Sequence, residues 1–122
     1  MIGYVTLGTN DLERAGKFYD QLLGELGASR MMDQDTFIAW GTAPGAPMLS
    51  VIKPFDGQAA SVGNGVMVAL LVDSREKVSA LHAKALELGG ADEGAPGQRG
   101  AGFYAGYFRD HDGNKLNVFC LG

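Results

Sequence analysis

Cysteine and histidine, which commonly act as nucleophiles, general bases or metal ligands, are few and scattered in this chain. Its 122 residues include one cysteine and two histidines. Cys120 lies two residues from the end, while His82 falls in a helical stretch and His111 in a tight turn. These positions support neither a Ser/His/Asp set nor a Cys/His pair. Nucleophilic catalysis therefore has no candidate, and the catalytic residues stay unassigned.

Glycine is the compositional anomaly, at 19 of 122 residues, against an ordinary usage of about 7%. The glycines crowd segments 41–45, 57–65 and 89–102, which we expect to be loops that surround a binding cleft. Phosphate binding is not supported, because the chain has neither a P-loop motif nor a dinucleotide-binding glycine motif. Arg99, on the third of these loops, is a candidate anion clamp, although an ordinary surface arginine is the simpler explanation.

Charge and hydropathy exclude several classes of partner. The net charge of −4 and the pI near 5.0 argue against nucleic acid or an anionic membrane as a partner. No apolar run approaches the roughly 18 residues of a membrane helix, and the N-terminus has no signal-peptide pattern. Because neither pattern is present, we expect a cytoplasmic protein. With 46% hydrophobic residues the chain has material for a core.

One pattern of strand and helix occurs twice. Residues 4–7 predict a strand, Asn10 with Glu13 predicts a helix cap, and apolar residues at helical spacing continue to position 26. The same order returns 63 positions later, with a strand at 67–72 and a cap formed by Asp73 and Glu76. This repetition indicates an internal duplication.

A predicted hairpin follows each helix. The first pairs residues 37–41 with 48–52, and the second pairs 104–109 with 115–119, at an offset of 67. The four extra residues fit in the loop before the second hairpin. Two tandem βαβββ modules, at about 1–57 and 64–122 of a single domain, therefore predict an α+β fold.

Two motifs resemble those of a known superfamily. The strand Val5-Thr6-Leu7 followed by Asn10-Asp11-Leu12 and Phe18-Tyr19 is similar to the opening module of the vicinal oxygen chelate superfamily. The segment from Tyr107 to Leu116, with Asp110-His111-Asp112-Gly113-Asn114, resembles its F-x-D-P-D-G-N hairpin, with histidine in place of proline. This superfamily includes glyoxalase I, bleomycin-resistance proteins and extradiol dioxygenases. The resemblance implies a curved mixed sheet around a concave cleft, with the helices outside.

The resemblance also implies where metal ligands would lie. Metal-dependent members carry histidine or glutamate, sometimes glutamine, on the first and last strand of each module. The matching positions here are Tyr4, Ser50, Met67 and Asn117. A phenol, a hydroxyl, a thioether and an amide bring no negative charge to offset a divalent cation. We therefore expect no metal and no other cofactor.

Strand alternation predicts which side chains line the cleft. A four-residue loop at 110–113 would pair Arg109 with Asn114 and Gly106 with Asn117. That register points one set of side chains inward, and the equivalent register in the first half adds a second set. Together with Arg99, the predicted ligand-binding residues are Tyr4, Phe37, Ser50, Met67, Tyr104, Phe108 and Asn117, while Thr6, Met48, Ile52, Ala69, Lys115 and Phe119 also face inward.

Other residues are expected to be structural. The same register turns Trp40 away from the cleft, to pack under a helix. His82 stands at the helical position equivalent to Tyr19 and is expected to be structural or on the surface, because the helices lie outside the cleft. His111 is expected to be exposed to solvent.

Two functions are favoured at this point, and a structural or regulatory module without a ligand is a third for which nothing in the sequence speaks. The absent metal ligands and the apolar, aromatic lining predict a metal-free small-molecule-binding protein. The resemblance implies a protein of the bleomycin-resistance type that forms a homodimer. The alternative is a glyoxalase-related lyase or isomerase, or a dioxygenase-like enzyme, that acts on a small metabolite. Such an enzyme would use unidentified metal donors, or Tyr4 or Tyr104 as a proton donor.

Overall fold

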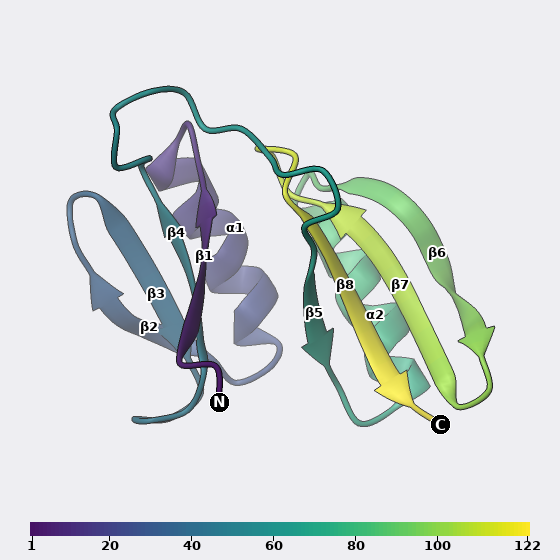
Figure 1. Cartoon of the computed structure of the whole chain (residues 1–122). Helices are drawn as coiled ribbons and strands as arrows, with labels where there is room; N and C mark the ends of the chain where they lie inside the picture. The colour runs from purple at the N-terminus through teal and green to yellow at the C-terminus, as the bar shows by residue number, and fades with distance from the viewer. The chain divides into compact units, whose positions relative to one another are not determined.

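The structure, a computed structural model, describes residues 1–122 and contains the predicted α+β pattern twice. The first unit, Met1–Val62, holds β1 (Tyr4–Gly8), α1 (Leu12–Gly24), β2 (Ser29–Asp33), β3 (Phe37–Gly41) and β4 (Met48–Ile52). The second unit, Gly63–Gly122, holds β5 (Val68–Leu71), α2 (Arg75–Glu87), β6 (Ala91–Gly100), β7 (Phe103–Arg109) and β8 (Lys115–Leu121). The prediction of two tandem βαβββ modules is confirmed (Figure 1).

Each unit builds its own mixed four-stranded sheet, in the order β1-β4-β3-β2 in one and β5-β8-β7-β6 in the other. The first strand of each unit runs parallel to the last, and the remaining neighbours are antiparallel. One helix packs on one face of each sheet (Figure 1). Neither helix is long and apolar enough to span a membrane.

The helix caps lie one residue later than the sequence predicted. Asp11, not Asn10, caps α1 by accepting a hydrogen bond from the Arg14 amide, and Ser74 caps α2. The Asn10 side chain instead bridges to the backbone of Ala60, accepting from its amide at 2.7 Å. The two caps remain 63 positions apart, so the duplication that predicted them holds despite the shift.

Helix α1 buries an apolar face against its sheet. Phe18, Tyr19 and Leu22 are at most 2% exposed, and the Tyr19 ring lies 5.5 Å from that of Trp40 on β3. Trp40 is therefore turned away from the open face of the sheet and packs under the helix, as predicted. The aromatic contact and the apolar burial together anchor α1 on β3.

The register predicted for the second hairpin is wrong by one residue. The turn holds five residues, and the strands pair Arg109 with Lys115 and Gly106 with Val118. Asp110 causes the difference, because its Oδ1 accepts from the amides of Asp112 and Asn114 and its Oδ2 accepts from the Asn114 side chain. These bonds hold Asn114 inside the turn and keep it out of the ladder.

The glycine-rich segment before the second hairpin is a strand rather than a loop. Strand β6 pairs with β7 through three register shifts, and Gly94, Gly97 and Gly100 are among its paired residues. Small residues suit such bulges, where the chain departs from the regular ladder. Arg99 therefore lies on a paired strand, which corrects its predicted place on a flexible loop.

Candidate functional site

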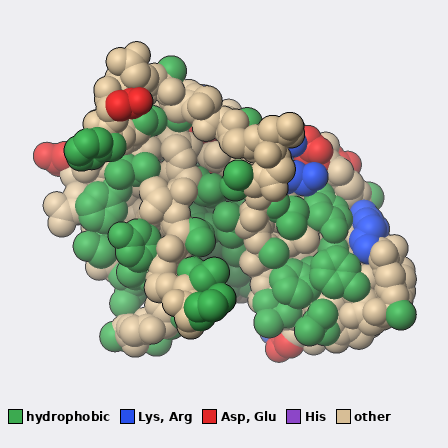
Figure 2. All heavy atoms as spheres, in the orientation of Figure 1, with side chains coloured by type: hydrophobic (Ala, Val, Ile, Leu, Met, Phe, Trp, Pro, Cys, Tyr) green, Lys and Arg blue, Asp and Glu red, His purple; other side chains and the backbone are tan.

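The face of the first sheet opposite α1 contains a pocket of about 240 Å³. Strands β1 to β4 all contribute side chains to it, and Figure 2 shows apolar side chains gathered over these strands. The lining consists of Tyr4, Thr6, Met32, Phe37, Ala39, Met48, Ser50 and Ile52. None of these side chains carries a charge, so the pocket suits an uncharged, largely apolar molecule.

Strand register explains why these side chains converge. Thr6 and Ala39 lie directly opposite Ser50 on either side of it, and Phe37 lies opposite Ile52. Directly paired residues share one face of a sheet, and residues two apart along a strand share it as well. The alternation predicted for the first unit is therefore confirmed, including Tyr4, Phe37 and Ser50 among the lining residues; ligand binding by them stays a prediction.

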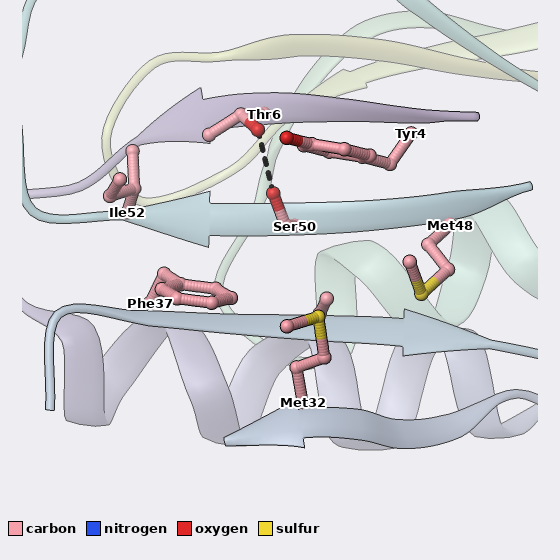
Figure 3. A pocket seen from close by; sticks show the side chains of 8 residues that line it. Tyr4, Thr6, Met32, Phe37, Met48, Ser50 and Ile52 are labelled. Atoms are coloured by element: carbon pink, nitrogen blue, oxygen red, sulfur yellow. Dashed lines mark hydrogen bonds between the residues drawn. The ribbon is translucent and has the colours of Figure 1, made fainter. Parts of the chain in front are cut away.

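A pair of hydroxyl groups provides a polar point in the pocket. Thr6 Oγ1 lies 2.8 Å from Ser50 Oγ, and Ser50 Oγ lies 3.2 Å from the Val5 carbonyl oxygen. Ser50 is only 3% exposed, whereas Thr6 and Tyr4 are exposed. Figure 3 shows the Tyr4 ring beside the pair, with its hydroxyl end toward Thr6 and Ser50.

The rest of the lining is adaptable. Phe37 supplies a flat aromatic surface, while Met32 and Met48 are flexible side chains whose sulfur atoms make favourable contacts with rings. Ala39, at 2% exposure, forms part of the floor and leaves room above it. Such a surface can adjust to an aromatic ligand without any buried charge.

Met32 and Ala39 are absent from the lining predicted from the sequence. Strand β2 was not identified there, and its pairing with β3 shifts between Arg30 and Met32, so simple alternation does not apply. Ala39 has the same parity as Phe37 and could have been found from it.

In the second unit, Asn117 occupies the position equivalent to Ser50, 67 residues later. It pairs with Ala69 on β5 and with Tyr107 on β7, where Ser50 pairs with Thr6 and Ala39. Ala69 has no hydroxyl group to offer. Asn117 is 1% exposed, and its Oδ1 has no hydrogen-bond partner, which is costly for a buried acceptor.

A hydroxyl group at position 69 should satisfy this oxygen. We expect Ala69→Thr to raise the free energy of unfolding by about 1 kcal/mol, because threonine there would donate to Asn117 Oδ1. Ala69→Val is the matched control, since it has the same shape without the donor. Urea denaturation of the three proteins measures the effect, and equal gains in both variants would show that packing rather than hydrogen bonding is responsible.

Two predicted ligand-binding residues lie on the helix side of the second sheet. Because of the shifted register, Phe108 pairs with Leu116 and Tyr104 with Cys120. Phe108 is fully buried beside His82, and the Tyr104 ring lies 4.8 Å from the Arg75 guanidinium of α2. Neither shares the face of Asn117, so we do not retain the prediction that they contact a ligand.

Two further predicted residues, Met67 and Arg99, belong to the second unit. Met67 is 40% exposed and precedes β5, and its role in ligand binding stays a prediction. Arg99 lies 5.5 Å from the Tyr107 ring, and Lys115 lies 5.4 Å from the same ring. Arg99 also donates to the Ala95 carbonyl, so it has partners within the unit without any bound anion.

His82 is structural, which is one of the two roles that the sequence predicted for it. It is 5% exposed, and its Nε2 lies 3.1 Å from both Asp92 Oδ1 and the Tyr107 carbonyl oxygen. Because both partners are acceptors, Nε2 carries a proton. Gly106 permits this approach, since a Cβ there would lie 3.1 Å from the ring.

The four positions implied as metal ligands do not fit a metal. Tyr4 is an exposed phenol and Met67 a thioether, Ser50 hydrogen-bonds to the Val5 carbonyl, and Asn117 is a neutral amide. No three or more histidine, cysteine, aspartate or glutamate side chains of the chain group together as metal ligands would. We derive no chemistry through a metal.

Comparison with known proteins agrees with this architecture. The family model of the glyoxalase/bleomycin resistance protein/dioxygenase superfamily matches residues 1–118. A crystal structure of a glyoxalase/bleomycin resistance protein from Albidiferax ferrireducens T118 is 36% identical, with a TM-score of 0.91, over 100% of this chain and 99% of that one. A putative glyoxalase from Bacillus halodurans is 25% identical, with a TM-score of 0.80, over 98% and 95% of the two chains.

A third structure shares the fold at lower sequence identity. TnmS3, an antibiotic binding protein from Streptomyces sp. CB03234, is 19% identical with a TM-score of 0.70, over 100% of this chain and 96% of that one. No curated protein matches the sequence.

Proposed function

The chain belongs to the glyoxalase/bleomycin resistance protein/dioxygenase superfamily, and we propose that it is a metal-free protein that binds a small hydrophobic or aromatic compound in the pocket on β1 to β4. The observation that carries this proposal is the uncharged lining of that pocket, with Phe37, Tyr4 and two methionines around a single hydroxyl pair. TnmS3, which shares the fold, is an antibiotic binding protein. A small-molecule-binding protein with this fold supports the proposal of a binding role for this chain.

The size of the pocket limits the ligand. Its 240 Å³ lies just below the range of about 300–1,000 Å³ that is common for drug-sized ligands. A compound of one or two fused rings fits that space, and a larger molecule would place only one end in it. The predicted homodimer, which could extend the binding surface, remains a prediction.

Thermal unfolding in the presence of neutral one-ring and two-ring aromatic compounds tests the proposal. A ligand present at about 100 times its dissociation constant stabilises the folded state by about 2.7 kcal/mol, which corresponds to a rise in Tm on the order of 10 °C for a chain of this size. The rise should saturate with concentration and persist in the presence of a chelator. If no compound of the panel raises the Tm, the proposal is wrong.

An enzymatic role is the second candidate, because the exposed Tyr4 hydroxyl beside the pocket is a potential proton donor. A lyase or isomerase of this type would convert a small metabolite bound against Phe37. Turnover of the methylglyoxal–glutathione hemithioacetal that survives chelation and is lost in Tyr4→Phe would favour it. Ligand binding with no turnover would favour the binding protein.

A further inference from the structure

We propose that the pocket selects uncharged aromatic compounds that carry an O–H or N–H group, such as phenols and anilines, because Thr6 Oγ1 meets the ligand as a hydrogen-bond acceptor. This inference rests on the proposed binding function and narrows the class of ligand. It follows from where the two protons of the Thr6–Ser50 pair must lie.

A serine hydroxyl has one proton, and the Ser50 proton is committed. The Val5 carbonyl oxygen can only accept, so the 3.2 Å contact requires Ser50 Oγ to donate to it. The 2.8 Å contact between Ser50 Oγ and Thr6 Oγ1 then requires Thr6 to donate to Ser50. Thr6 Oγ1 keeps its lone pairs and has no proton left to offer a ligand.

The side chains around Thr6 determine which hydrogen-bond donors a ligand can bring into the pocket. Its hydroxyl shares the pocket with Tyr4, Phe37, Met48 and Ile52, and no lysine or arginine lines the pocket to balance an anion. A carboxylate buried there would lose its hydration, and no charged partner would compensate for that loss. A neutral phenol places its ring against the apolar lining and its proton on Thr6 Oγ1.

The second unit lacks this arrangement. Ala69 occupies the position equivalent to Thr6, and the large side chain of Tyr107 occupies the position equivalent to Ala39. The acceptor and the space above it therefore occur together in the first unit. Because the acceptor and the space occur in the same unit, we assign the hydroxyl pair a role in ligand binding and not in sheet stability alone.

Two ligands that differ in one proton test the inference. We choose 2-naphthol and 2-methoxynaphthalene, which share the ring system, because the ether accepts hydrogen bonds but cannot donate them. The two compounds differ in hydrophobicity, so the readout is the change in the ratio of their affinities between protein variants. Titration calorimetry or ligand fluorescence measures both dissociation constants.

Removal of the acceptor should remove the selectivity. Thr6→Val keeps the shape of the side chain without its oxygen, and we expect it to shift the affinity ratio about tenfold toward the ether, which is the effect of one net hydrogen bond. Thr6→Ser keeps the hydroxyl and should retain the wild-type ratio. Thermal unfolding of each variant verifies that the fold is intact.

A further variant tests whether Thr6 donates the hydrogen bond between the two hydroxyl groups. Ser50→Ala takes away the acceptor for the Thr6 proton, which frees that proton for a ligand, so the ether should gain relative to the naphthol. Tyr4→Phe removes the other hydroxyl near the pocket, and in that background Thr6→Val should still shift the ratio toward the ether. A ratio that changes with Tyr4→Phe but not with Thr6→Val would assign the selectivity to Tyr4 and overturn the inference.

The remaining outcomes separate this inference from the proposed function. If both compounds bind and the ratio is the same in the wild type and in Thr6→Val, the pocket binds aromatic molecules but Thr6 does not select among them. If neither compound binds, the proposed function and the inference based on it both fail.

Discussion

Replacement of Asp20 by alanine is expected to lower the free energy of unfolding by about 2 kcal/mol. Asp20 Oδ1 accepts from Trp40 Nε1 at 2.8 Å, and both carboxylate oxygens accept from Arg30 at 2.8 Å. Trp40 is 1% exposed, so its indole N–H would lose the acceptor that it has in the folded protein. The cost is that of a buried donor left without an acceptor.

The ion pair itself should add less than the indole bond. The Asp20 side chain is 41% exposed and the Arg30 side chain 33%, so solvent screens their attraction. Asp20→Asn can retain the bond to Trp40 while it loses the charge, and we expect it to cost about half as much as alanine. Urea denaturation compares the variants. If both unfold at the wild-type midpoint, this contact does not hold α1 on its sheet.

The stability that the Asp20 contact contributes should depend on pH. Hydrogen bonding from Arg30 is the main cause that lowers the pKa of Asp20 below its usual value of 3.8, with a further contribution from Trp40. A lowered pKa in the folded state gives stability that is present above the usual carboxyl pKa and lost as the pH falls through the folded value. The difference in stability between the wild type and Asp20→Ala should therefore shrink below about pH 3.8.

This contact was not predicted from the sequence, because it joins side chains of three consecutive elements, α1, β2 and β3, and β2 was not identified from the sequence. Arg30 lies on β2, a strand without a clear alternating pattern, and its side chain passes over Gly16 of α1. A Cβ at Gly16 would lie 2.8 Å from the guanidinium. Helical periodicity explains why Gly16 faces the sheet, but it does not indicate which cation lies above it.

Strand register marks the limit of what could be predicted. The duplication and the alternation within β3 and β4 correctly placed Tyr4, Phe37 and Ser50 on one face. In the second hairpin, the hydrogen bonds that Asp110 makes inside its turn lengthened the loop by one residue. That single step moved Tyr104 and Phe108 to the helix side. Sequence patterns show that side chains alternate along a strand. Which side chains face the helix depends on the hydrogen bonds of the turn, which the pattern does not contain.

The duplication also shows how the two units diverged. At the centre of each open face, Ala39 and Thr6 surround Ser50 in one unit, whereas Tyr107 and Ala69 surround Asn117 in the other. In the second unit, Arg99 and Lys115 also lie against the tyrosine ring. A small residue at position 39 is thus the change that leaves space for a ligand in the first unit.

Filling that space should abolish binding. Ala39→Phe places a ring in the 240 Å³ pocket between Phe37 and Met32, and we expect it to weaken the binding of any aromatic ligand by about 100-fold or more. The new ring enters an existing space, so the free energy of unfolding should change by no more than about 1 kcal/mol. Ala39→Leu serves as a smaller version, in case the ring disturbs the sheet.

The matched control adds the same ring elsewhere. Ala43 lies exposed in the turn between β3 and β4, and Ala43→Phe should bind ligand as the wild type does. Calorimetric titration with 2-naphthol, together with thermal unfolding, separates the loss of binding from the loss of fold. Unchanged affinity in a folded Ala39→Phe protein would mean that the ligand binds elsewhere, because a phenyl ring and a naphthalene ring cannot share a pocket of this size.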